Sequence, residues 1–222
     1  MFRNAVLPKR HVLAVANVAL IVLLGGASMA ARAVPITGLF NTGVDGSGVA
    51  LGNGASDPHY AILSPSQAAV VINSGSIPAS WLPNSSTRRW VWQTAIGSPL
   101  GVTRTFRTTF DLTGLNPATA AINGRWATDN SGLDILINGN STGNTCGGFS
   151  AFCNFAVTSG FVSGINTLDF RVRDFGVIAG FLVGSIGGTA EQSGVVPEPA
   201  TLVLLGLGLA GFGFRGRKTP KP

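Results

Sequence analysis

The stretch RTFRTTFDL, residues 104–112, decides the fold class because its side chains alternate in character one by one. Successive side chains of a β-strand point to opposite faces of the sheet, so this alternation predicts a strand with one buried and one solvent-facing side. The face expected to be buried carries Phe106, Thr108, Phe110 and Leu112. The opposite face carries Thr105, Arg107, Thr109 and Asp111.

Shorter runs of the same kind surround this strand, with Gly, Asn, Asp and Pro between them. They predict strands at residues 89–96, 120–127, 133–137, 167–173 and 180–186. Turns are expected at pairs such as Asn123-Gly124 and Asn138-Gly139. One short helix is expected at residues 64–71, which open with Ser-Pro. We therefore predict an all-β fold, an antiparallel β-sandwich or jelly roll, over residues 34–186.

The N-terminal part has the three-part layout of a secretory signal peptide. Basic residues precede an apolar segment at residues 12–24, which is shorter than the ~20 residues that span a bilayer. Small residues follow, and Ala31 and Ala33 suit the two specificity positions of signal peptidase. Residues 1–33 are therefore expected to be a signal helix that is cleaved after Ala33, with Ala30 as the alternative cleavage position.

A second apolar segment lies near the C-terminus. Residues 187–196 are mainly glycine and polar residues, which predicts a flexible linker. Residues 200–214 carry no charge and predict a membrane helix, although a helix of ~22 Å is short for a ~30 Å hydrocarbon core. Arg215, Arg217 and Lys218 follow and favour the cytoplasmic side, so the domain is expected outside the membrane.

The formal charge of +6 comes mainly from the two ends of the chain. Between residues 34 and 196, seven arginines stand against seven aspartates and one glutamate, which leaves a net charge of −1. A domain so close to neutrality has no surface suited to a phosphate backbone. We therefore expect no nucleic-acid partner.

The two cysteines, Cys146 and Cys153, lie in the part expected to be exported, where an oxidising compartment favours a disulfide. Closing this short loop would restrict the unfolded chain by about 2.5 kcal/mol in the loop-entropy description. Their spacing is not Cys-x-x-Cys, and no second ligand pair accompanies them, so a redox or metal role is the weaker alternative.

The C-terminal residues resemble a known sorting signal. Pro197, Glu198 and Pro199 precede the apolar segment, and the basic cluster ends the series. This order resembles the PEP-CTERM sorting signal over residues 197–222. The resemblance implies recognition by a membrane exosortase that cuts near the Pro-Glu-Pro and releases or attaches the domain at the surface of an envelope-bearing bacterium.

The domain shows a second resemblance, to a recurrent PEP-CTERM ectodomain. It rests on residues 57–60, 84–90, 107–112, 124–130 and 133–139. The last two segments are also similar to galactose-binding-like jelly rolls, in which an acidic turn precedes a strand that ends in Asn-Gly. Many such jelly rolls bind sugars, so the resemblance implies a carbohydrate-binding role.

Tryptophans are the first candidates for sugar contacts, because an aromatic face offers apolar area to the C–H side of a pyranose. Trp81, Trp90 and Trp92 are the candidates, with core packing as the competing interpretation for each. Trp126 alternates with Ile122 and is expected in the core. The polar members of the candidate set are Asp129, Asp134 and Asn138.

Asp129 and Asp134 admit two further interpretations. With Asn130 and backbone carbonyls they would supply the oxygen ligands that Ca²⁺ prefers. As paired carboxylates they would suit glycosidase chemistry, although residues flanking a Gly-containing turn more often cap it. His59, the only histidine outside the predicted signal peptide, is expected to be structural.

Taken together, these features predict an exported, non-catalytic protein without a cofactor. Signal peptidase and an exosortase are the expected partners, the inner membrane holds an anchored intermediate, and a polysaccharide is the candidate ligand. The final location is then the cell surface or the extracellular matrix. The alternatives are a secreted polysaccharide-active enzyme and a structural matrix component with no defined ligand.

Overall fold

Strand β5 (Thr103–Asp111) contains the alternating stretch, and the computed structural model, which describes residues 32–194, confirms its alternation. Phe106, Thr108 and Phe110 are buried, as is Leu112 just beyond the strand. Thr109 on the opposite face is exposed. The predicted all-β class is therefore confirmed.

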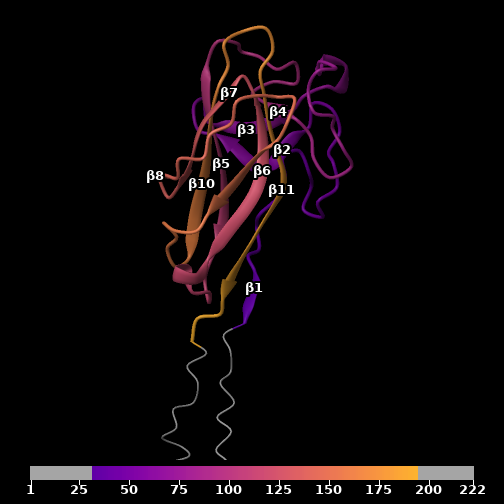
Figure 1. Ribbon diagram of the computed structural model, residues 1–222. Coiled ribbons are helices and arrows are strands. Elements are labelled where there is room, and N and C mark those ends of the chain that lie inside the picture. Colours follow the sequence, from indigo (N-terminus) through magenta and orange to yellow (C-terminus); the bar gives the residue numbers. More distant parts are fainter. Residues whose placement is uncertain (1–31, 195–222) are drawn as a thin grey trace, which may run out of the picture. The chain divides into compact units, whose positions relative to one another are not determined.

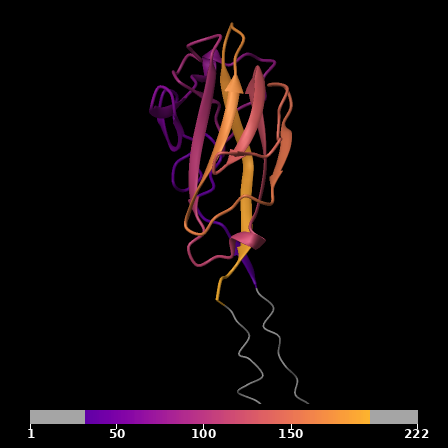
Figure 2. The ribbon, with the colours of Figure 1, turned by 90° about the vertical axis from the view of Figure 1, so that its left-hand side faces the viewer.

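Ten further strands are present among the described residues, and the longest of them run along the long axis of the domain (Figures 1 and 2). They are β1 (Ala33–Pro35), β2 (Ser56–Ile62), β3 (Gln67–Val71), β4 (Val91–Trp92), β6 (Ala121–Asp129), β7 (Ser131–Ile137), β8 (Asn140–Ser141), β9 (Cys153–Val157), β10 (Ile165–Arg173) and β11 (Gly180–Glu191). Two short 3-10 helices, η1 (Ser74–Ser76) and η2 (Pro117–Thr119), interrupt the loops.

All these strands belong to one sheet, in which neighbours are antiparallel. The order is β8-β7-β10-β5-β2-β3-β4-β11-β6-β9, and β1 pairs with β11 outside this path. Every strand predicted from the sequence overlaps a strand of the sheet, although the run at 89–96 is reduced to the two residues of β4. Strands β1, β2, β3, β8 and β9 were not predicted as strands.

The sheet folds back on itself, and aromatic side chains meet across its interior. Phe170 of β10 contacts Phe181 of β11, with ring centroids 5.1 Å apart, although five steps of the sheet order separate these strands. Phe170 also contacts Trp126 at 5.6 Å and Phe155 at 5.7 Å. Phe106 of β5 stacks on Phe181 at 4.6 Å. These contacts join two facing halves around one core.

The helix predicted at residues 64–71 is wrong, because Gln67–Val71 forms β3. Ala69 and Val71 are fully buried while Ala68 is exposed, so the segment alternates with a period of two. The Ser-Pro pair that suggested a helix start lies instead in the turn between β2 and β3.

The flexible linker predicted at residues 187–196 is also wrong over its first half. Residues 187–191 continue β11 and pair with β6 or β1. A Cβ on Gly188 would lie 2.7 Å from the Ala121 carbonyl oxygen, so glycine here permits close packing of strands. Likewise, the turn predicted at Asn123-Gly124 lies inside β6, where a Cβ on Gly124 would meet the Phe155 ring at 2.7 Å.

The two ends of the described domain lie side by side (Figure 1). Ala33 pairs with Glu191, and the backbone N–H of Ser193 donates to the carbonyl of Gly114 at 2.9 Å. Only residues 194–196 therefore separate the last hydrogen-bonded residue of the domain from Pro197. Cleavage after Ala33, if it occurs, leaves two of the three residues of β1 in place.

The predicted signal helix and the predicted membrane helix at residues 200–214 lie outside the described residues. Within residues 32–194, no helix is long and apolar enough to span a membrane.

Phe170 should be the most sensitive position of the interior, because it contacts aromatic rings from both halves. Phe170→Ala is expected to lower the free energy of unfolding by about 3–5 kcal/mol, measured by urea denaturation. Ile165→Ala on the same strand is the control, since Ile165 is 64% exposed and its truncation should change stability little. Equal losses in the two variants would contradict the assigned core.

Candidate functional site

The three tryptophans that were candidates for sugar contacts lie in the interior, in agreement with the competing interpretation of core packing. Trp90 and Trp92 are fully buried, and Trp81 is 5% exposed. The indole N–H of Trp90 donates to the Leu82 carbonyl at 2.7 Å, and that of Trp92 donates to the Pro99 carbonyl at 3.1 Å. Trp126 is buried, as predicted.

Trp81 and Trp90 belong to a small apolar cluster on the outer side of β11. Their ring centroids are 4.3 Å apart, and Phe149 lies 6.1 Å from Trp81. A Cβ on Gly180 would overlap the Trp81 ring, so this glycine lets the loop pack directly on the strand. The face that suggested a binding platform is thus covered by the chain itself.

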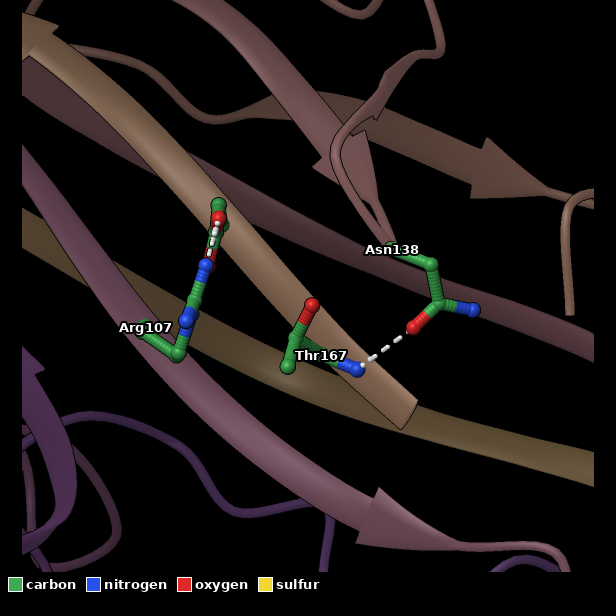
Figure 3. A network of polar contacts seen from close by, with 4 residues as sticks. Arg107, Asn138 and Thr167 are labelled. Carbon is green, nitrogen blue, oxygen red and sulfur yellow. Dashed lines mark hydrogen bonds and ion pairs between the residues drawn. The ribbon is translucent and has the colours of Figure 1, made fainter. Parts of the chain in front are cut away.

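Asn138 is not free to bind a ligand either, because its carboxamide is used between β7 and β10 (Figure 3). Its oxygen accepts from the Thr167 backbone N–H at 2.9 Å. Its nitrogen donates to the Asn166 side-chain oxygen at 2.8 Å and to the Gly160 carbonyl at 2.9 Å. With φ of 50°, Asn138 also opens the tight turn to β8 together with Gly139, as the sequence predicts.

The predicted Ca²⁺ ligands are not brought together. Asp134 lies opposite Arg171 of β10 and accepts from the Gly143 backbone N–H at 3.1 Å. The Asn130 side-chain oxygen accepts from the Phe175 backbone N–H at 2.6 Å. Asp129 lies opposite Gly180 of β11. Among residues 32–194, no group of three or more His, Cys, Asp or Glu side chains is placed to hold a metal ion.

Asp129 has a different neighbour, Asp174, which the sequence did not indicate. The two residues are 6% and 1% exposed, and the Oδ1 atom of each has no hydrogen-bond partner within the described part of the chain. Burial and the Asp174 charge raise the pKa of Asp129 to about 6, against an opposing effect of the Trp81 side chain. Asp174 is held by the backbone N–H groups of Gly101 and Gly176.

A hollow of about 410 Å³ lies beside β2 and β5, lined in part by Asp57, His59 and Arg107. These groups are already engaged. Asp57 accepts from three backbone N–H groups, including that of Gly43 at 2.6 Å, and burial still raises its pKa. The His59 ring stacks on Phe40 with centroids 3.7 Å apart.

Arg107 is also engaged, in a two-pronged ion pair with Asp169 of β10 (Figure 3). Its Nε and Nη2 each donate to one carboxylate oxygen at 2.7 Å. The hydrogen bond to Asp169 raises the pKa of Arg107. It is the only ion pair among residues 32–194, and it pins β5 to β10 on the outer face of the sheet.

The other outer face carries a cluster that sequence analysis missed. The Phe152 ring contacts two guanidinium groups, with the Cζ of Arg125 4.5 Å and that of Arg88 5.3 Å from its centroid. Both distances suit cation–π interaction. Gly184 of β11 lies beneath, where a Cβ would be 3.1 Å from the Arg88 Cδ and 3.3 Å from the Phe152 ring.

Beside this cluster lies an open hollow of about 360 Å³, which we call the β6–β9–β11 groove. Its exposed polar side chains are Asn123, Asn154 and Ser185, and it is further lined by Gly124, Arg125 and Phe155. Arg125 and Asn154 are paired across β6 and β9. This groove therefore combines amides, a hydroxyl and a guanidinium on one surface, and the buried Phe155 completes its lining.

The disulfide holds this surface in shape. Cys146 and Cys153, the pair predicted from the sequence, are joined with Cα atoms 5.5 Å apart. Cys153 pairs with Trp126 of β6, and Cys146 exchanges two backbone hydrogen bonds with Gly132 of β7. Phe152 directly precedes Cys153, so the disulfide-closed loop positions the Phe152 ring against Arg88 and Arg125.

Little in the sequence pointed to this cluster. Arg88, Phe152 and Arg125 are far apart in the chain, and their meeting depends on how β9 pairs with β6. The short disulfide loop between Cys146 and Cys153 was the nearest available signal, because it implied a fixed loop around two phenylalanines.

Comparison with known proteins identifies the C-terminal segment. The PEP-CTERM protein-sorting motif matches residues 195–218, which include the Pro-Glu-Pro and the basic residues predicted to form the sorting signal. No curated protein matches the chain. The motif implies export, sorting by an exosortase at the membrane and extracellular release.

Asp129→Asn should stabilise the protein at neutral pH. A carboxyl group with a raised pKa binds its proton more tightly in the folded state, so its contribution favours folding at acid pH and is lost between about pH 4 and 6. The variant is expected to gain about 2 kcal/mol at pH 7.5 and much less at pH 4, measured by urea denaturation.

The matched control is Asp111→Asn. Hydrogen bonds from Thr113 lower the pKa of this exposed aspartate, so neutralising it should not stabilise the protein at either pH. A pH-independent effect of Asp129→Asn would contradict the raised pKa.

Proposed function

We propose that this protein is a non-catalytic envelope or matrix protein whose exported domain binds polysaccharide at the β6–β9–β11 groove. The sorting motif supports the export and processing steps. The groove carries the binding proposal, because it is the place where exposed amides and a hydroxyl adjoin aromatic rings. The earlier resemblance to galactose-binding-like jelly rolls supports the same proposal.

The chemistry of the groove suits sugar recognition. Ring hydroxyls exchange hydrogen bonds with side-chain amides and hydroxyls, which Asn123, Asn154 and Ser185 supply on an exposed surface. An open, shallow surface admits an internal stretch of a long polymer, whereas an enclosed pocket would admit only a chain end.

The burial of the paired carboxylates supports a non-catalytic role. Glycoside hydrolysis needs two carboxyl groups that flank the scissile bond. Burial and the Asp174 charge raise the pKa of Asp129, which would suit a general acid. Both are almost completely buried, however, and neither lines the β6–β9–β11 groove.

Processing at the sorting motif should depend on its prolines and glutamate. Replacing Pro197, Glu198 and Pro199 by alanine is expected to leave an uncleaved, membrane-associated form, detected by fractionation and intact-mass measurement. Replacing Gly194 by alanine is the control, because it lies beside the matched motif and should leave cleavage intact, so that the mature mass rises only by the added methylene group. An unaltered mature mass in the triple variant would contradict the processing step.

Polysaccharide binding should be lost when the groove is altered. Residues 32–194 belong to one compact unit, so a fragment of residues 30–196 can be screened on a glycan array. Asn154→Ala is expected to reduce the affinity for any glycan that binds by about fivefold, the value of one net hydrogen bond. Thr109→Ala removes an exposed polar group from the other hollow and should change nothing. Absence of every glycan signal would refute the binding proposal.

A further inference from the structure

If the proposed function holds, the positive charge of Arg88 and Arg125 indicates which class of polysaccharide the groove binds. Arg88 and Arg125 flank one phenyl ring, so their guanidinium carbons lie no farther apart than about 10 Å, roughly one Debye length in 0.1 M salt. Two like charges this close repel each other. Burial and the Arg125 charge accordingly lower the pKa of Arg88.

No counter-charge within the described part of the chain offsets this repulsion. Neither guanidinium makes an ion pair or a side-chain hydrogen bond there, and the Nε atoms of both are buried without a partner. Two other arginines of the domain are engaged by side chains of the protein itself. Arg107 pairs with Asp169, and Arg104 donates to Gln93 at 2.7 Å.

The cluster is held in place although it is not neutralised. Phe152 is fixed by the adjacent disulfide residue Cys153, Arg125 extends from the middle of β6, and Gly184 leaves room for the Arg88 stem. Guanidinium groups positioned before a ligand arrives lose little freedom on binding one, which favours affinity. Carboxylates are the planar anions that such groups bind in a two-pronged manner.

We propose that the ligand of the β6–β9–β11 groove is an acidic polysaccharide, with sugar carboxylates bound by Arg88 and Arg125 and with neighbouring hydroxyls bound by Asn123 and Asn154. Repeated carboxylates along a uronic acid polymer allow one chain to meet both arginines. The near-neutral charge of the whole domain argues against nucleic acid, which needs a broader basic surface.

The test compares one polymer with and without its charges. Residues 30–196 are titrated by biolayer interferometry against immobilised polygalacturonate, carboxyl-reduced polygalacturonate, dextran and single-stranded DNA. We expect binding to polygalacturonate that weakens steeply as salt is raised, and little binding to the carboxyl-reduced polymer. Arg125→Gln and Arg88→Gln should each weaken polygalacturonate binding by about tenfold.

Arg171→Gln is the matched control, because it removes the same charge from an exposed position on β10. The thermal stability of every variant is compared first, by thermal denaturation. If a glutamine variant is unstable, Arg125→Lys is used as a second variant. Lysine keeps the charge but cannot bind a carboxylate in a two-pronged manner, so it should restore only part of the affinity.

The other outcomes separate the two proposals. Polygalacturonate and its carboxyl-reduced form could bind equally well, with no effect of the arginine substitutions. That result would overturn the proposal that the ligand is acidic, while polysaccharide binding would still stand. Binding of single-stranded DNA at least as tight as that of polygalacturonate would also overturn it. If neither these polymers nor any glycan on the array binds, polysaccharide binding itself fails.

Discussion

The contact between Phe170 and Phe181 determines the rest of the architecture. Their strands lie five steps apart in a single sheet, so this contact converts a continuous ladder into two facing halves. Burial of these rings, with Trp126, Phe155 and Phe106 around them, removes much apolar surface from water. The two outer faces are then free to differ, and only one of them presents an arginine cluster without a counter-charge.

Charge is used sparingly in this domain, and each charged group has a distinct local arrangement. Asp57 is surrounded by backbone N–H groups, and Arg107 is matched by Asp169. Asp129 is buried beside another carboxylate, which costs stability once it ionises. Arg88 and Arg125 both lie against the Phe152 ring, and neither makes an ion pair within residues 32–194. Unbalanced charge at an open surface is more consistent with a ligand than with stability.

The sequence predicted the strands well where alternation was strong and predicted the binding residues poorly. Phe106, Thr108 and Phe110 were correctly assigned to the interior because a period of two identifies a buried face locally. Trp90 and Trp92 stayed candidates for both a ligand site and the core, because nothing local reveals that their segment packs on β11. Two glycines were misinterpreted for the same reason. Gly124 was assigned to a turn and Gly188 to a linker, whereas each lies in a strand and allows another chain segment to approach that strand closely. Asn138 and Asp134 were recognised as special, but their side chains serve backbone groups.

The position of β11 has a mechanical consequence. It is the longest strand, its C-terminal end leads toward the sorting segment, and it is hydrogen-bonded to β6 from Gly180 to Thr189. If the domain were held at that end while a polymer pulled on β6 and β9, the load would pass along the strands. Hydrogen bonds of an antiparallel ladder lie perpendicular to that direction and would be sheared together rather than unzipped in turn. The arrangement would therefore resist tension along its axis.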